Sequence, residues 1–582
     1  MNEPRTVSMP LTTAQRGLWV TQKLAGADAT LNIAEAVEIA GPIEPEPFLR
    51  ALRQVVREIE PLRARVVEED GKPRQIVRPV YSGDFPVVDL SGRVDPAAAA
   101  EVWMRAELMR PVDLAHDPLW VSALFKLAED RYVWYHRAHH VVFDGYSGGL
   151  LVRRVAHLYT AHVEGREPAA CEFGSLAALV EAEAAYRGSR RFERDREFWR
   201  EQLADLPEAV TLARGPRRDE GGLQHSVGYL PVAKARRLAA LGGESGVSLP
   251  QVLIGLIAAY YHRVTGARDL VFAMPVSGRV GAAWRKLPGM AANAMPLRLA
   301  FAPETTAIEL FEQVSQVVRR ALRHQQYRYE DIHRDQGLLG KGEHLARLAI
   351  NIEPFDYQLR FGDARATSRN LSNGSQEDLT TFVFDRGDDS DLCFCFDANP
   401  ALYSTAELDE HRRRLMLLVD AVLDAPGAPL RRLDILGDEE RRRLLVAWND
   451  TAGPLPETPL PALVARQAAR TPDAPAVVFE ETVLSYRELH ERSARQASRL
   501  IADGVEPGDV VAVALPCSEQ LLVALLAILR VGAAYLPIDL DGPAERASLM
   551  LDDAAPRALI TSPELAARFA REDLILSWPE PQ

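Results

Sequence analysis

The stretch that decides the fold of this chain is WYHRAHHVVFDGYS, residues 134–147. Its first ten residues are apolar or alternate in the manner of a β-strand, and Gly145 and Ser147 mark the start of a helical pattern. The sequence therefore predicts a strand, a tight turn and a helix that together present two histidines and an aspartate. Because side chains alternate between the faces of a strand, His139 and His140 should point in opposite directions, so that only one meets a substrate.

A pair of neighbouring histidines is most often structural, since a buried imidazole usually satisfies its own hydrogen bonds. Here, however, His139 and His140 are followed at a fixed offset by Asp144 and Gly145. This His-His-x-x-x-Asp-Gly pattern resembles the signature of the condensation domains of nonribosomal peptide synthetases, and the match is complete. The resemblance implies an enzyme that joins two substrates held as thioesters.

The overall composition indicates a globular chain and excludes two classes of partner. With 582 residues, 47% hydrophobic and 26% charged, the chain is long enough for about three or four compact units. Its net charge of -14 argues against nucleic acid and membrane surfaces as partners. The N-terminus lacks the pattern of a signal peptide, and the most hydrophobic run, residues 521–529, is far shorter than the roughly 20 residues of a membrane span.

The four cysteines are few and scattered, which favours a cytoplasmic location and argues against a disulfide framework. Cys393 and Cys395 fall two residues apart in a strand pattern, so both should lie on one face. Because no second pair of ligands lies nearby in the sequence, we expect no metal site.

A second resemblance concerns the arginine that would pair with Asp144. Residues 11–19 resemble the first condensation motif, with Thr12 or Thr13 as a helix N-cap, but Gly17 replaces its usual Arg. Residues 46–66 are expected to form an amphipathic helix that runs into the second motif. In that motif an Arg pairs with the Asp of the His-His motif, and by position it is Arg63; a buried carboxylate needs such a cationic partner. The alternative, a solvated Arg63 at a helix end, remains open.

The remaining motifs follow in the family order up to about residue 435. The helical pattern of residues 147–203 contains Trp199, which resembles a structural Trp of the family, and residues 204–224 should form an exposed connection. Helices are expected at 233–241 and 249–265. Further stretches that resemble family motifs or complete the second lobe are 270–279, 289–299 with Asn293, 323–329 with Arg328 in place of the usual Pro, 351–359 and 378–384.

The resemblance implies an α/β (α+β) fold of two chloramphenicol-acetyltransferase-like lobes in a V-shaped pseudo-dimer, with the active-site His in a tunnel at their junction. The expected lobes are residues 1–180 and 181–435, followed by a linker at 436–456. Residues 457–582 resemble the N-terminal part of an adenylation domain. The sequence ends before any Gly-rich loop that could hold ATP phosphates, so ATP and Mg are expected only for a complete adenylation domain.

The site residues follow from the same resemblance. His140 is expected to be catalytic, supported by His139, Asp144, Gly145, Arg63 and Trp199. In this view Asp144 and Arg63 form an ion pair that shapes the turn, and Gly145 admits its tight backbone path. The residues expected to line the substrate tunnel are Tyr146, Ser147 and Asn293.

The implied chemistry is amide formation between two thioesters, each on the 4'-phosphopantetheine arm of a carrier protein. A free α-amino group has a pKa near 8, so roughly a quarter of it is neutral at pH 7.5, and deprotonating it beforehand would gain less than about tenfold. General-base assistance contributes about 10² to 10⁴. His140 should therefore accept the proton once the amine has added to the carbonyl, or hold the amine in line; the sequence is compatible with both roles.

Other activities remain compatible with the sequence. Related domains form esters or dehydrate or epimerise the tethered residue, and some are silent carrier-docking modules. A serine nucleophile at Ser147 is a poorer interpretation, because no Gly-x-Ser-x-Gly elbow surrounds it. Since the first motif begins close to Met1, we expect an upstream acyl or aryl carrier to deliver the donor in trans, and a downstream peptidyl carrier to hold the acceptor. Within the family the chain looks most similar to the serine-activating modules of enterobactin-type siderophore synthesis.

Overall fold

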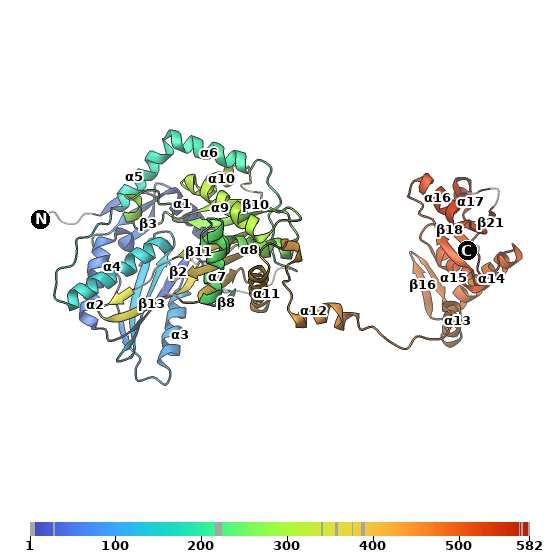
Figure 1. Ribbon diagram of the computed structural model, residues 1–582, viewed down its shortest axis with the longest axis horizontal. Coiled ribbons are helices and arrows are strands. Elements are labelled where there is room, and N and C mark those ends of the chain that lie inside the picture. Colours follow the sequence, from blue (N-terminus) through green and yellow to red (C-terminus); the bar gives the residue numbers. More distant parts are fainter. Residues whose placement is uncertain are drawn as a thin grey trace. The chain divides into compact units, whose positions relative to one another are not determined.

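The computed structural model describes residues 6–26, 29–215, 224–338, 341–354, 359–374, 376–385, 390–569, 571 and 574–579. Two compact units form, Met1–Leu445 and Val446–Gln582 (Figure 1). Residues 355–358 of the predicted strand-rich segment and residues 216–223 of the predicted connection lie outside the described residues.

A six-stranded sheet with the order β12-β13-β2-β7-β6-β5 forms the centre of the first lobe. Helices α2 and α4 pack on one face around Phe48 and Trp134, and α3 covers the other face. The strands are β2 (Asn32–Ala40), β5 (Val87–Asp89), β6 (Trp120–Ala128), β7 (Arg131–His139), β12 (Leu359–Phe361) and β13 (Ala364–Asn373). The helices are α2 (Pro45–Glu58), α3 (Pro96–Leu108) and α4 (Gly145–Val163).

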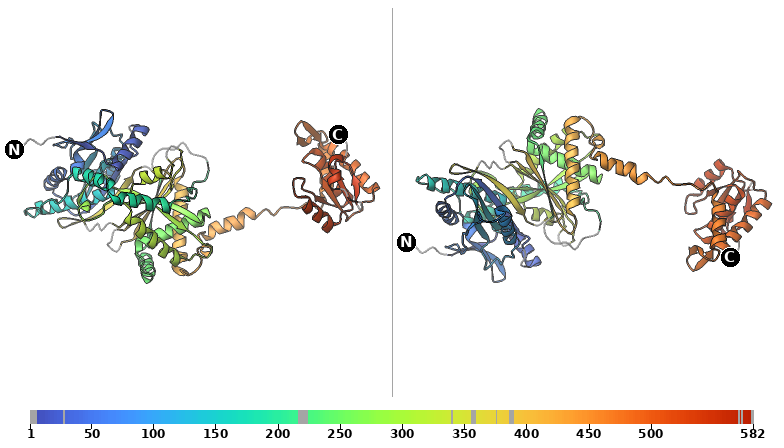
Figure 2. Two further views of the ribbon diagram at one scale, coloured as in Figure 1. Left: turned by 90° about the horizontal axis from the view of Figure 1, so that it is seen from above. Right: turned by 90° about the horizontal axis from the view of Figure 1, so that it is seen from below.

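Two strands of this sheet come from the second half of the sequence. β13 runs antiparallel to β2, with Arg365 opposite Ala40, so a late segment completes the sheet of the first lobe (Figure 2). The expected lobes, by contrast, are contiguous in sequence. This crossover of β12 and β13 into the first sheet connects the two lobes through backbone hydrogen bonds.

A small sheet, β1 (Val7–Pro10), β4 (Lys72–Val77) and β3 (Ala64–Glu69), lies beside helix α1 (Thr13–Ala25). Of the two predicted N-caps, Thr12 caps α1 and forms a capping box with Gln15. The predicted helix over residues 46–66 is too long. α2 ends at Glu58, and a 3-10 turn at Glu60–Arg63 leads into β3, because Pro61 has no N–H to continue the helical hydrogen bonds.

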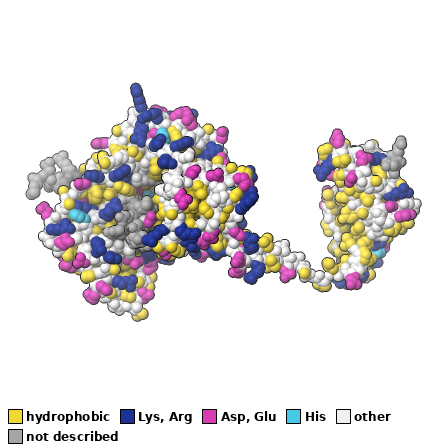
Figure 3. All heavy atoms as spheres, in the orientation of Figure 1, with side chains coloured by type: hydrophobic (Ala, Val, Ile, Leu, Met, Phe, Trp, Pro, Cys, Tyr) yellow, Lys and Arg dark blue, Asp and Glu magenta, His cyan; other side chains and the backbone are white. Residues whose placement is uncertain are grey.

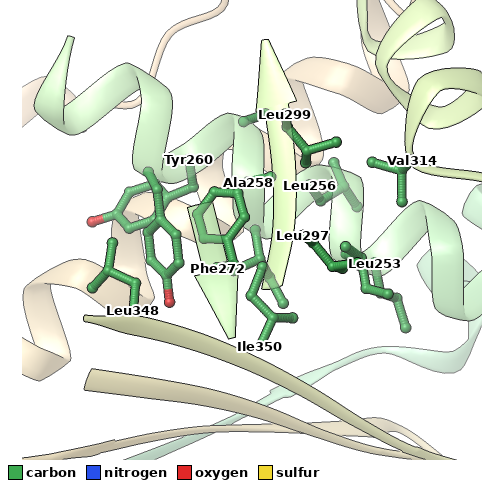
Figure 4. Packing of buried hydrophobic residues seen from close by; sticks show 14 of the residues in the cluster. Leu253, Leu256, Ala258, Tyr260, Phe272, Leu297, Leu299, Val314, Leu348 and Ile350 are labelled. Carbon is green, nitrogen blue, oxygen red and sulfur yellow. The ribbon is translucent and has the colours of Figure 1, made fainter. Parts of the chain in front are cut away.

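The second lobe is built on a six-stranded sheet of order β10-β9-β11-β14-β15-β8. Its core lies between this sheet and the buried helix α8, where Leu253, Tyr260 and Phe272 pack together (Figure 4). The helices predicted at 233–241 and 249–265 are confirmed as α7 (Val232–Glu244) and α8 (Leu249–Thr265). The strands are β8 (Gln224–Leu230), β9 (Asp269–Val276), β10 (Asn293–Ala300), β11 (Leu348–Pro354), β14 (Leu379–Asp385) and β15 (Leu392–Ala398).

Several helices join and cover the lobes. The helical pattern predicted from residue 147 to about 203 consists of α4 and two further helices, with a non-helical connection at residues 164–175 and a short break at residues 188–189. Helix α9 has an apolar face that packs against α8 and β10. These elements are α5 (Leu176–Arg187), α6 (Arg190–Gln202), α9 (Ala307–Arg323), α10 (Tyr329–Asp335) and α11 (Thr405–Asp424).

One face of the second sheet packs on helices α8, α9 and α11, and the described residues of the other face line a cavity. Along β14 the residues Leu379 and Val383 point into the core, whereas Thr380, Phe382 and Phe384 line a cavity. The same alternation continues on β15 and β8, as expected for strands with a period of two. One face of this sheet is therefore structural, and the other is available to a ligand.

The second unit contains a hairpin, β16 (Pro475–Phe479) with β17 (Thr482–Ser485), and a parallel sheet of order β19-β18-β20-β21. Helix α12 (Asp438–Leu445) ends the first unit, and the 3-10 turn Ala447–Asn449 stands at the start of the second. Its helices are α13 (Leu460–Arg470), α14 (Tyr486–Ala502), α15 (Glu519–Val531), α16 (Ala544–Ala554) and α17 (Pro563–Phe569). The strands of the parallel sheet are β18 (Val510–Ala514), β19 (Ala534–Pro537), β20 (Ala558–Thr561) and β21 (Ile575–Ser577).

The surface bears both signs of charge. Acidic and basic side chains are interspersed on the face drawn in Figure 3. In the described part of the chain, no single helix combines the length and the apolar composition that a bilayer span needs; α7 and α8 do so only as a pair, with a bend of 100° between them.

Replacing Trp199 tests the packing of α6 on the second lobe. Trp199 is 3% exposed in the core, whereas Trp448 is 67% exposed. We expect Trp199→Ala to lower the free energy of unfolding of the first unit by about 3–5 kcal/mol through loss of burial and a cavity. Trp448→Ala should change it by less than about 0.5 kcal/mol. Urea unfolding measures both, and equal effects would contradict this packing.

Candidate active site

The predicted strand, turn and helix are present. β7 ends at His139, α4 begins at Gly145, and Asp144 is the N-cap of α4. His139 is buried, while His140 lines a cavity of about 820 Å³ between the two sheets. The two histidines therefore face opposite ways, as the alternation along the strand predicts.

His139 is fixed as a neutral imidazole under the turn. Its Nδ1 accepts the backbone N–H of Val141 at 3.2 Å, and its Nε2 lies 3.0 Å from the side-chain oxygen of Gln22. Nε2 must therefore carry the proton and donate it to Gln22. Burial, and then the neighbouring His140 and Arg137, lower the pKa of His139 to about 3. His139 supports the turn and does not exchange protons near neutral pH.

The tautomer of His140 is set by the backbone of the same turn. Its Nδ1 lies 2.9 Å from the carbonyl oxygen of Phe143, and a carbonyl only accepts, so Nδ1 carries the proton of the neutral ring. The lone pair is then on Nε2. The adjacent Cδ2 would be 3.9 Å from a Cβ on Gly374, which lines the same cavity. His140 can thus accept a proton from a group in the cavity.

Asp144 fastens the turn to the second lobe. Its Oδ1 accepts the N–H and the hydroxyl of Ser147 at 2.9 and 2.7 Å. Its Oδ2 accepts Arg279 Nη1 at 2.8 Å and the N–H groups of Ala291 and Ala292 at 3.0 and 2.9 Å. All these donors converge on a fully buried carboxylate, so its position is fixed from both lobes.

The ion pair keeps this buried carboxylate charged. Burial opposes ionisation of Asp144, but the charge and hydrogen bond of Arg279 and the backbone donors outweigh it and hold the pKa of Asp144 below its ordinary value. A lowered pKa in the folded state stabilises the protein above the ordinary carboxyl pKa, and this contribution is lost as the pH falls through the lowered value.

The prediction that Arg63 pairs with Asp144 is wrong. Arg63 donates to the backbone carbonyl of Val56, near the end of α2, and to that of Arg78, directly after β4. The partner is Arg279, which follows β9 and has a fully buried side chain. Arg279 ends the stretch 270–279, which resembles a family motif. Sequence alone does not decide which arginine reaches a buried carboxylate, because that depends on the fold.

The predicted tunnel residues lie elsewhere. Ser147 is fully buried and bonded to Asp144 and Gly289, which also excludes it as a nucleophile. Asn293 is 6% exposed and donates to the carbonyls of Gln325 and Tyr327. The Tyr146 hydroxyl donates to the carbonyl of Arg285. All three side chains donate hydrogen bonds to backbone carbonyls. None of them is among the described residues that line the cavity.

Gly145 has a different role from the one predicted. Its φ is not positive, and a Cβ there would meet no atom within 4 Å, so the backbone path does not require glycine. Gly145 is exposed and lines the cavity. The missing side chain therefore leaves this part of the cavity wall open. Trp199, expected to be structural, packs in the core of the second lobe and donates to the carbonyl of His324.

The cavity also contains carboxylates that sequence reasoning did not single out. Glu353 on β11 accepts a hydrogen bond from Asn351 at 2.8 Å, and Glu35 on β2 lines the same cavity. Burial, followed by the charge of Glu35, raises the pKa of Glu353 to about 7. The alternation of side chains along β11 does not by itself show that Glu353 faces the cavity, because the face that lines the cavity depends on the neighbouring strands.

Removing either arginine tests the corrected pairing. We expect Arg279→Ala to lower the free energy of unfolding of the first unit by about 3–5 kcal/mol, because the buried charge of Asp144 loses its partner. Arg63→Ala should cost about 1 kcal/mol, since only hydrogen bonds to carbonyls are lost. Chemical denaturation of the two variants distinguishes the pairs, and a larger cost for Arg63→Ala would contradict the Arg279 assignment.

Comparison with protein families agrees with this geometry. The family model of the condensation domain matches residues 6–445, and that of the AMP-binding enzymes matches residues 464–578. Among solved structures, a variant of the starter condensation domain of rhizomide synthetase RzmA in complex with C8-CoA has a TM-score of 0.69 and 36% identity, covering 74% of this chain and 98% of that one. The first condensation domain of the calcium-dependent antibiotic synthetase has a TM-score of 0.69 and 32% identity, covering 74% and 99%.

Curated relatives are longer than this chain. A dimodular nonribosomal peptide synthase of Bacillus subtilis (strain 168) is 38% identical over 568 residues, which cover 97% of this chain and 24% of that protein. Enterobactin synthase component F of Escherichia coli (strain K12) is 34% identical over 569 residues, covering 97% and 44%. The chain thus spans less than half of each. It belongs to the condensation-domain family of nonribosomal peptide synthetases, with the N-terminal part of an AMP-binding domain after the condensation domain.

Proposed function

We propose that the first unit forms an amide bond between an upstream acyl, aryl or peptidyl thioester and the amine of a downstream aminoacyl thioester, with His140 as the catalytic residue. The observation that supports this most is the fixed tautomer of His140. The carbonyl of Phe143 holds the Nδ1 proton, so a basic Nε2 remains for a substrate in the cavity.

The reaction needs one proton acceptor at one place. The amine nitrogen forms a bond to the donor carbonyl carbon, which gives a tetrahedral adduct with a cationic nitrogen. Nε2 of His140 takes a proton from that nitrogen, the C–S bond breaks with its electron pair on sulfur, and the proton is returned to the thiolate. General-base assistance of this kind contributes about 10² to 10⁴, and holding the amine in line adds to it.

The surrounding residues act through His140. His139 fixes the start of the turn through Gln22 and Val141. Asp144 fixes its end through Ser147 and Arg279. We assign His139, Asp144 and Arg279 as positioning residues, because their side chains are hydrogen-bonded within and beneath the turn. Gly145 lines the same cavity without a side chain.

The substrates are carried by partner proteins. The donor would arrive on the phosphopantetheine arm of an acyl or aryl carrier supplied in trans, and the acceptor on a downstream peptidyl carrier. Support comes from the relatives, since enterobactin synthase component F and the dimodular synthase are synthetases of the same type. We place the reaction in siderophore or other secondary-metabolite synthesis in the cytoplasm. ATP and Mg would serve only a complete adenylation domain.

Single-turnover condensation tests the role of His140. The chain is mixed with carriers loaded with an aryl or aminoacyl donor and a seryl or threonyl acceptor, and intact-protein mass spectrometry follows the acceptor. We expect the acceptor to gain the donor mass, and His140→Ala to slow this at least about 10²-fold. His116→Ala is the matched control, because the His116 side chain is 81% exposed, and should keep the rate.

Two outcomes would overturn the proposal. If His140→Ala transfers the donor as fast as the wild type, His140 is not the catalytic residue. If the wild type transfers no donor although both carriers bind, amide formation fails for these substrates, and ester formation or carrier docking becomes the better account.

A further inference from the structure

Three potential metal ligands converge on the cavity-facing side of the second sheet. β8 and β15 are antiparallel neighbours, with His225 directly opposite Asp397. Cys395 lies two residues before Asp397 on β15, and alternate residues of a strand share a face. The pairing thus brings an imidazole, a thiol and a carboxylate to one place, although His225 is 170 residues from Cys395 in the sequence.

The three ligand atoms form a compact triangle. His225 Nδ1 lies 2.7 Å from Asp397 Oδ1 and 3.1 Å from Cys395 Sγ, and Cys395 Sγ lies 2.9 Å from the same oxygen. In a tetrahedral zinc site, bonds of about 2.0–2.3 Å separate the ligand atoms by roughly 3.3–3.6 Å. Opening the triangle by roughly half an ångström per edge would therefore admit the ion.

The environment of the triangle is that of a site open on one side. The side chain of Asp397 is 2% exposed and that of His225 is 46% exposed, and both His225 and Cys395 line the cavity. Asn373 donates to the other carboxylate oxygen of Asp397 at 3.2 Å, which orients the ligand from the second sphere. Within the described residues, this is the one group of three such side chains whose ligand atoms meet.

We propose that His225, Cys395 and Asp397 bind a divalent metal ion of the zinc type, with a fourth coordination position open to the cavity. Sulfur, imidazole nitrogen and carboxylate oxygen together form a donor set that zinc accepts. The sequence suggested no metal site, because no second pair of ligands lies near Cys393 and Cys395 in the chain. In the structure, His225 comes from a neighbouring strand and Asp397 from the end of β15.

Binding exchanges protons for the metal. In the metal-free arrangement the Cys395 thiol and the His225 Nδ1–H both point at Asp397 Oδ1. The ion takes the place of these two hydrogens: the Nδ1 proton of the neutral imidazole is lost and Nε2 takes up a proton from solvent, while the thiol proton is released to solvent. The open position then holds water, which a nitrogen, oxygen or sulfur donor of a cavity ligand can displace.

Metal titration of the full chain tests the site without any condensation assay. After removal of metal by a chelator, the chain is titrated with Zn²⁺ against a chromophoric competitor, and with Co²⁺ under anaerobic conditions. We expect one equivalent of Zn²⁺, a thiolate-to-Co²⁺ charge-transfer band, and at least about a tenfold loss of affinity in Cys395→Ser and in Asp397→Asn. Cys393→Ser is the matched control on the same face of β15 and should bind as the wild type does.

The result that overturns the proposal is equally direct. A folded wild type that does not bind one equivalent of Zn²⁺ excludes the site. An equal loss of affinity in Cys393→Ser and Cys395→Ser also excludes it. Because wild-type stoichiometry decides the first outcome, a variant that fails to fold does not protect the proposal. Failure here would leave the role of His140 unchanged, since neither readout involves amide formation.

Discussion

The ion pair between Asp144 and Arg279 is the constraint on which the active site depends. It joins the N-terminus of α4 in the first lobe to the segment after β9 in the second. Both side chains are withdrawn from solvent, and separating them would leave a buried charge without a partner. The turn that carries His140 is therefore fixed relative to both lobes. The crossover of β12 and β13 into the first sheet adds a second connection between the lobes, through the backbone.

The chemistry follows from this fixed turn. Because His139 bonds with Gln22 and His140 with the carbonyl of Phe143, each imidazole has one defined tautomer. Of these two histidines, only His140 is among the described residues that line the cavity. The opposite wall is the uncovered face of the second sheet, which supplies polar groups such as Glu353 and His225. One sheet thus provides both the core of its lobe and a wall of the cavity, through the alternation of side chains along its strands.

Local patterns in the sequence predict local structure well here. The strand, the turn, the helix start marked by Gly145 and Ser147, the opposite directions of the two histidines and the helices α7 and α8 all follow from the sequence pattern. The partner of Asp144 does not, since Arg63 and Arg279 are both plausible until the fold is known. The family motifs suggest Ser147 and Asn293 as tunnel residues. In the structure, however, both side chains donate hydrogen bonds to backbone carbonyls, those of Gly289 and Gln325. The remaining cavity residues could not be predicted from the sequence, because strands that are distant in the chain bring them together.

The most direct test of this account is a double-mutant cycle between Asp144→Asn and Arg279→Gln, followed by the rate of single-turnover condensation and by the free energy of unfolding. The account predicts that each single variant is slower and less stable, and that the second change adds little to the first, with a coupling of at least about 1 kcal/mol in both measurements. Additive effects, or a full condensation rate in Asp144→Asn, would show that this pair does not hold His140 in place.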